Sequence, residues 1–213
     1  WKKFIKAVSL ITFDESDKKI PDEAIEMIKK ATAVWLYGDL SKHFANTQLK
    51  EELAALLHRD GVIGGQGRAA ESMAMLVEDG KNLHDGFNLI PNSFIQADRN
   101  NYEAFVETVN SMPGRLGWYI PPKSSVVIHD GRKISVITFP EIRLLTAANG
   151  PWKERHDSYG PAIDELPYTA DLIAWNRSGI SRLGEAFPPA IAPVPEIPNG
   201  ALMIIGGSGY PDG

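Results

Sequence analysis

Two short apolar runs, each closed by glycine and separated by a leucine-rich helix, constrain this fold most. The first is Ala33 to Tyr37, followed by Gly38 and Asp39, and the second is Val62 to Gly65. Uncharged runs of this length are typical of strands covered on both faces, as in parallel sheets. The helix between them is indicated by Leu49, Leu53, Leu56 and Leu57 and ends before Gly61.

Further helices are expected on both sides of this unit. Pro21 to Ala31 shows helical apolar spacing, with proline in the first turn where its missing N–H does no harm. A third helix, indicated by Ala70, Met73, Ala74 and Val77, is expected to stop at Gly80. The alternation of helices and strands predicts a doubly wound α/β fold with a mostly parallel sheet. The fourth helix is indicated by Tyr102, Phe105, Val106 and Val109 and stops before Pro113.

Strands dominate the second half, where Asp130 and Gly131 form a strong hairpin signal. We therefore expect a small antiparallel extension of the sheet. Residues 148–198 are rich in proline and aromatic residues, have weak periodicity and are expected to be irregular. The expected strands are Phe87 to Pro91, Leu116 to Ile120, Ser124 to His129 and Lys133 to Ile137.

Composition favours one domain spanning residues 1–213, with 43% hydrophobic residues and a net charge of -5. This charge offers no basic face, so neither nucleic acid nor a membrane surface is an expected partner. No apolar run approaches the ~20 residues that cross a bilayer, and no signal peptide is evident. Because the chain begins with Trp1, we expect a longer precursor. These features do not decide the cellular compartment of the protein.

Metal and cysteine chemistry are not expected. The chain has no cysteine, which excludes disulfides, thiolate metal sites and cysteine nucleophiles. No two histidines have the i, i+4 spacing of a helical metal site, and we expect no cofactor. The histidines are His43, His58, His84, His129 and His156.

The glycine turn after the second apolar run carries a family resemblance. Residues 61–70 read GVIGGQGRAA. The segment resembles the cyanophycinase and peptidase E family of serine peptidases, which reads Gly-x-x-x-Gly-Gly-Thr-Ser-Ala-Gly-Ala. There a sharp strand-to-helix turn exposes the nucleophilic serine at a helix N-terminus. Gly64, Gly65 and Ala70 match, but Gly67 stands at the serine position. A phosphate-binding loop is the weaker alternative, because its fingerprint residues are absent.

The resemblance continues downstream with altered chemistry. The family's Gly-Leu-x-Leu-x-Pro becomes GFNLIP at 86–91, and its Asp-Gln-His-Phe aligns with residues 96–99. Gln96 then takes the place of the aspartate and Asp98 that of the catalytic histidine, and most substrate-reading arginines are absent. The family's acidic Gly-x-x-x-Asp-Glu-x-Thr-Ala becomes GWYIPPKSS at 117–125, without the acid.

The last part of the chain resembles the family's first strand. Residues 199–209, NGALMIIGGSG, match a segment that normally precedes all the others. Either the domain is circularly permuted or the chain spans a boundary between sequential copies. The resemblance covers roughly Trp35 to Thr146 plus this strand, and it implies a flavodoxin-like fold of the class I glutamine amidotransferase type. Ser208, in the glycine turn, is interpreted as a turn residue.

The candidate pocket gathers where these strands end. Arg68 is interpreted as solvated, in preference to an anion receptor. Asp39 is either a ligand-site residue or the N-cap of the next helix. The pocket residues are Gly38, Asp39, Gly65, Gln66, Gly67, Arg68, Gln96, Asp98 and Arg99.

Loss of nucleophile, histidine and acid together indicates a pseudoenzyme, because the members of a catalytic triad act as a unit. We therefore expect a non-catalytic binding or structural domain. Two alternatives stay open: an active serine hydrolase of this family with relocated residues, and an unrelated α/β ligand-binding protein. Partners left open are a small peptide or acidic ligand, a homo-oligomer, or a neighbouring domain of a longer precursor.

Overall fold

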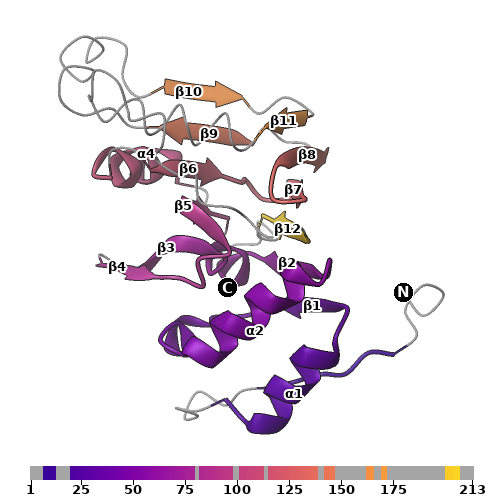
Figure 1. The fold of residues 1–213 in the computed structure, drawn as a ribbon. Coiled ribbons are helices and arrows are strands. Elements are labelled where there is room, and N and C mark those ends of the chain that lie inside the picture. Colours follow the sequence, from indigo (N-terminus) through magenta and orange to yellow (C-terminus); the bar gives the residue numbers. More distant parts are fainter. Residues whose placement is uncertain are drawn as a thin grey trace, which may run out of the picture.

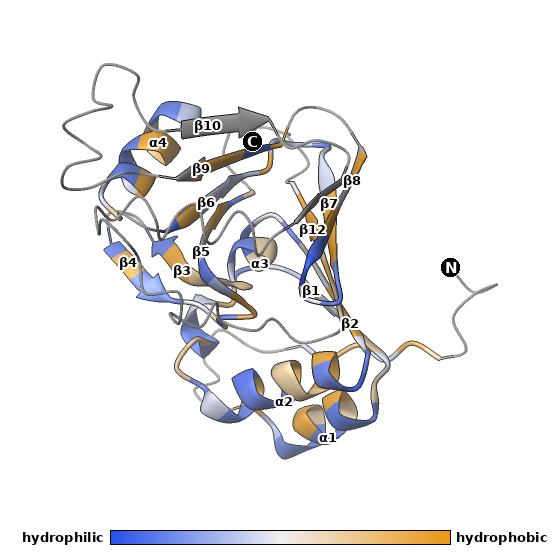
Figure 2. Ribbon diagram, turned by 45° about the horizontal axis from the view of Figure 1, so that its top comes forward, coloured by the Kyte–Doolittle hydropathy of each residue, from blue (hydrophilic) through white to orange (hydrophobic). Residues whose placement is uncertain are grey.

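The computed structural model is mixed α/β and describes residues 7–12, 20–79, 82–97, 101–112, 115–138, 142–146, 162–165, 169–171 and 200–206. Two six-stranded sheets face each other, and helix α3 lies between them (Figures 1 and 2). The helices are α1 (Asp22–Lys30), α2 (Thr47–His58), α3 (Arg68–Glu71) and α4 (Tyr102–Asn110), with a 3-10 turn η1 (Ser41–His43).

The first sheet runs in the order β1-β2-β12-β7-β8-β11. Strands β1, β2 and β12 are parallel to one another. The remaining pairs, β12–β7, β7–β8 and β8–β11, are antiparallel. The chain's last described strand, β12, therefore lies in the sheet interior, parallel to β2 and antiparallel to β7. The bounds are β1 Ala33–Leu36, β2 Val62–Gln66, β7 Ser125–His129, β8 Lys133–Thr138, β11 Thr169–Asp171 and β12 Ala201–Ile205.

The second sheet runs in the order β10-β9-β6-β5-β3-β4. Strands β3, β5 and β6 are parallel, and the outer strands pair antiparallel. Helix α4 packs on this sheet through a second apolar cluster that includes Phe94, Phe105 and Leu145. The bounds are β3 Ala74–Asp79, β4 Asn82–Asp85, β5 Ile90–Gln96, β6 Leu116–Tyr119, β9 Arg143–Thr146 and β10 Ala162–Glu165.

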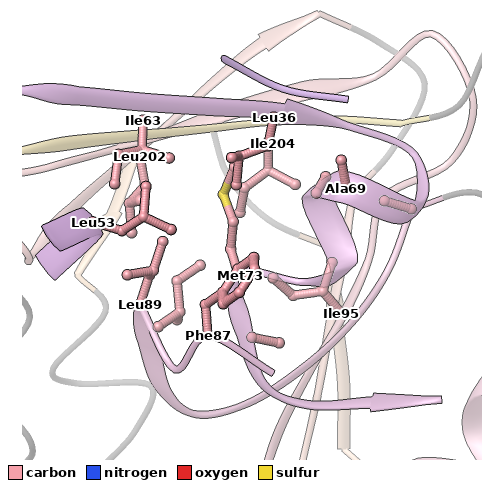
Figure 3. Packing of buried hydrophobic residues seen from close by; sticks show 14 of the residues in the cluster. Leu36, Leu53, Ile63, Ala69, Met73, Phe87, Leu89, Ile95, Leu202 and Ile204 are labelled. Carbon is pink, nitrogen blue, oxygen red and sulfur yellow. The ribbon is translucent and has the colours of Figure 1, made fainter. Parts of the chain in front are cut away.

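The main core fills the space between the two sheets and α2. Figure 3 shows Ile63, Leu202 and Ile204 from the first sheet facing Met73 and Leu89. Burying a side chain of this size stabilises the fold by about 1.5–3 kcal/mol relative to leaving it exposed. The core therefore ties the C-terminal strand to the segment that follows α3.

Several sequence predictions are confirmed. The apolar spacings correctly predict α1, α2 and α4, and the hairpin of β7 and β8 turns at Asp130 and Gly131, whose φ angles are 51° and 60°. The α/β class is confirmed as well. The prediction that residues 148–198 are irregular is wrong at Ala162–Glu165 and Thr169–Asp171, which form β10 and β11 by pairing antiparallel with β9 and β8. The rest of this segment lies outside the described residues.

The prediction of a third helix extending to Gly80 is wrong beyond the first turn. It ends at Glu71, where the Ser72 hydroxyl donates 2.6 Å back to the Ala69 carbonyl, and the chain enters β3 at Ala74. Strand pairing with β4 and β5 satisfies the backbone there and still buries Ala74 and Val77. This early exit takes the chain into a second sheet, so the expected single sheet is replaced by two mixed ones.

Two strand predictions also differ from the structure. The strand expected at Phe87 to Pro91 is shifted, because Phe87 lies in the connection between β4 and β5, and β5 runs from Ile90 to Gln96. The polar residues in β5 interrupt its apolar pattern, so the sequence did not indicate the full strand. The run Ala33 to Tyr37 is an edge strand and is not covered on both faces, since the Trp35 side chain is 48% exposed.

Candidate functional site

Gly67 forms a tight turn between β2 and α3, as the resemblance implies. Its φ of 54° and ψ of -128° lie where residues with a side chain are strained. The Gly67 N–H donates 3.0 Å to the Ile205 carbonyl of β12, and its carbonyl accepts from Glu71 N–H at 3.1 Å. The turn thus has the backbone of a nucleophile elbow and no side chain that could act as nucleophile.

Gly65 allows α3 to approach β2 closely. A Cβ at this position would lie 2.7 Å from the Met73 methyl carbon and 3.1 Å from the Ala70 nitrogen. Ala69 and Ala70, both on α3, are fully buried, and Figure 3 shows Ala69 on this helix. Small residues are therefore required on both sides of the turn. Gln66, the last residue of β2, pairs with Ile205 and is half-buried.

Arg68 forms a buried network next to the turn. Its guanidinium lies 2.6 Å from the Glu71 carboxylate and donates 2.7 Å to the Glu78 carbonyl. The Arg68 side chain is 19% exposed and that of Glu71 is 4% exposed. The interpretation of Arg68 as solvated is therefore wrong: the charge-assisted bonds hold its side chain over α3 and β3.

Glu71 connects the turn to the end of β5, a role that the sequence patterns did not indicate. Its second carboxylate oxygen accepts a 3.0 Å hydrogen bond from the Ala97 N–H, which directly follows β5. The only sequence signal for this role is the i, i+3 spacing of Arg68 and Glu71 on a helix. The two strand ends that the resemblance assigns to nucleophile and base are thus joined by one buried carboxylate.

Asp39 lies after β1, where its carboxylate accepts 2.8 Å from the Ser41 N–H and caps the 3-10 turn. Burial raises the pKa of Asp39, but hydrogen bonds from Ser41 and the positive charges of Arg68 and Lys42 outweigh it and leave this pKa below its usual value. Asn46, rather than Asp39, caps the leucine helix. Gly38 has a φ of 80° and open space around it.

Gln96, at the end of β5, is buried with 3% exposure. Its side-chain amide donates 3.0 Å to the Asn101 carbonyl, which positions the start of α4. An amide bound in this way contributes structure rather than proton transfer. Asp98 and Arg99, as well as His156 and Ser208, lie outside the described residues.

An aromatic cluster lies beside Gln96. Tyr119 pairs with Gln96 across the sheet and makes an edge contact with Tyr102 at 5.0 Å between ring centroids. The Arg143 guanidinium lies 4.9 Å from the centre of the Tyr102 ring. Burial raises the pKa of Tyr119, although the Arg143 charge opposes this, so the phenol stays neutral near pH 7.

Within the described ranges, no group of three or more acidic or histidine residues could hold a metal ion. None of the helices in those ranges is long and apolar enough to cross a membrane. No protein-family model matches the chain, and no curated protein matches it in sequence. These comparisons therefore assign the chain to no family.

Proposed function

We propose that this chain is a cyanophycinase-like or peptidase E-like domain that has lost catalysis and serves in binding or structure. The observation that supports this most is Gly67, which adopts the φ and ψ of an elbow turn without a nucleophile. Glycine adopts this conformation readily, whereas a residue with a side chain would be strained there by about 1–3 kcal/mol. Retention of the turn without the serine is what descent from an enzyme would leave.

The polar groups around the turn support the same proposal. Glu71 neutralises Arg68 and binds the backbone after β5, so both groups already have partners. By the alignment Asp98 stands at the position of the histidine. A carboxylate with a pKa near ~4 is a poor base for a serine hydroxyl at neutral pH.

We also propose a more specific fold for the parallel part of the first sheet. The parallel unit of β1, α2, β2 and β12 resembles the central part of a flavodoxin-like fold of the class I glutamine amidotransferase type. β12 lies beside β2, so the strand that resembles the family's first strand joins the nucleophile strand from the chain's other end. Circular permutation and sequential copies both supply a strand in this way. A small peptide or acidic ligand, or an adjoining domain, is the partner class we propose.

Hydrolysis assays test the proposal. The unmodified protein is expected to show no turnover of aspartyl dipeptides or of the aspartate-arginine polymer cyanophycin above background. Gly67→Ser alone is expected to stay inactive because its hydroxyl lacks a base. The double variant Gly67→Ser with Asp98→His tests whether the scaffold still aligns the two positions. Turnover by the unmodified protein that a serine-directed inhibitor abolishes would show that the active site has moved.

A further inference from the structure

Strand β1 has one open edge in the described part of the chain. It pairs with β2 on one side only. The Thr32 carbonyl accepts a 3.1 Å bond from the Val62 N–H, and backbone groups alternate along a parallel ladder. The N–H and C=O of Val34 therefore face β2, whereas those of Ala33 and Trp35 face away from it.

This edge lacks the features that usually prevent strands from pairing with other chains. Such features are charged side chains, proline and β-bulges. The run Ala33 to Tyr37 contains no charge and no proline, and its pairing with β2 has no bulge. Both large aromatic side chains of the run are accessible, Trp35 at 48% and Tyr37 at 78% exposure.

The other described edge strands differ in this respect. β4 contains Asp85, β10 contains Asp164 and Glu165, and β11 contains Asp171. Acidic residues on an edge discourage pairing with an identical strand, because two like charges would face each other. Among the four edges that the structure describes, β1 alone is uncharged.

We propose that β1 is the interface for a second copy of this chain, paired antiparallel across a two-fold axis at Trp35. The register of this strand pairing follows from the alternation of backbone N–H and C=O groups along β1. If Trp35 pairs with Trp35 of the second copy, the next hydrogen-bonding pair joins Ala33 to Tyr37, and symmetry repeats it on the other side. A two-fold axis makes such a strand self-complementary. The first sheet would then continue through both copies and cover the aromatic side chains.

Cysteine crosslinking tests this register directly, because the chain has no cysteine of its own. In a hydrogen-bonded antiparallel pair the Cα atoms lie ~5.5 Å apart, which is within the range of a disulfide. Trp35→Cys is therefore expected to give a covalent dimer under mild oxidation, roughly tenfold faster than Ile137→Cys. Ile137 is the matched control, since it is 54% exposed and lies on β8, an interior strand of the same sheet.

Sedimentation equilibrium of the unmodified protein gives an independent readout. The pairing is short, so we expect a weak dimer that dissociates on dilution. Trp35→Glu should shift the chain to monomer by placing two carboxylates opposite each other, whereas Ile137→Glu should not. Equal crosslinking of the two cysteine variants, or a protein that stays monomeric at every concentration, would overturn the proposal. A dimer that Trp35→Glu leaves intact would place the interface elsewhere and overturn it as well.

Discussion

The end of β2 and the end of β5 lie at one site and differ in the groups that they present. At β2 the backbone forms an elbow-like turn, and its central residue is Gly67. At β5 the strand ends in Gln96, which is buried and bound to the start of α4. One end has geometry without a reactive group, and the other has a polar group that is already used for structure.

The two ends are connected by one buried side chain. Glu71 bonds to Arg68 beside the first end and to the Ala97 backbone at the second. These bonds indicate that Glu71 links the two ends and stabilises the fold.

The largest expected effect is that of Glu71→Ala, which breaks the link between the two ends. It leaves the Arg68 guanidinium and the Ala97 N–H without their partner, and removing one member of a buried ion pair costs about 3 kcal/mol of unfolding free energy. Urea denaturation measures it. The control is Glu26→Ala, which breaks the exposed pair with Lys29 at 2.7 Å and should cause no measurable loss. Equal stability of the two variants would refute the link.

Gly67→Ala tests the β2 end and should lower the free energy of unfolding by about 2 kcal/mol, because alanine is strained at this φ and ψ. Gly38→Ala is the matched control. Its φ of 80° is also positive, but open space surrounds it, so a loss of about 1 kcal/mol is expected. Thermal unfolding of the two variants measures both losses of stability. If Gly67→Ala were the milder change, the elbow geometry would be wrong.

Gln96→Ala tests the β5 end. Loss of its hydrogen bond to the Asn101 carbonyl should lower the unfolding free energy by about 1 kcal/mol. Amide hydrogen exchange should also speed up in the first turn of α4. Gln48→Ala, at an exposed position on α2, is the control and should change neither quantity. A faster exchange throughout the chain would instead indicate global destabilisation.

The smallest effect concerns pH. The pKa of Asp39 is lower in the folded protein than its usual 3.8, so its ionised form stabilises the fold. That contribution is complete above the unfolded pKa and is lost as the pH falls through the lowered folded pKa. Solvent screening at this exposed carboxylate limits the effect to about 0.5 kcal/mol or less. Melting temperatures between pH 2 and 6 should therefore fall slightly less steeply for Asp39→Asn, and an identical slope would contradict the assignment.

Local patterns predicted the helices well, because each buries one apolar stripe. Leu49, Leu53, Leu56 and Leu57 are all buried on α2. The same logic failed after Glu71, since Ala74 and Val77 fit a helical period and are also buried in β3. Strand pairing with β4 and β5 decides between the two, and the apolar spacing contains no such information.

The site was predictable in part for a similar reason. Glycine spacing located the turn at Gly67, because backbone conformation constrains nearby residue types. The role of Glu71 depends on Ala97, which is 26 positions away in the sequence, and that of Arg68 on the Glu78 carbonyl, which is 10 positions away. Exposure preferences alone suggested a solvated arginine. Contacts between distant segments instead hold Arg68 in a hydrogen-bonded network. Neither composition nor periodicity contains information on such contacts.

Labelling with a fluorophosphonate probe, followed by intact mass measurement, tests the central claim most directly. Such probes bond covalently to a serine hydroxyl only where a base and an oxyanion site activate it. The account predicts that the folded protein gains no adduct, and that the signal equals that of the denatured chain. Stoichiometric labelling of one serine in the folded protein, lost on denaturation, would show an assembled catalytic site and contradict the assignment of this domain as non-catalytic.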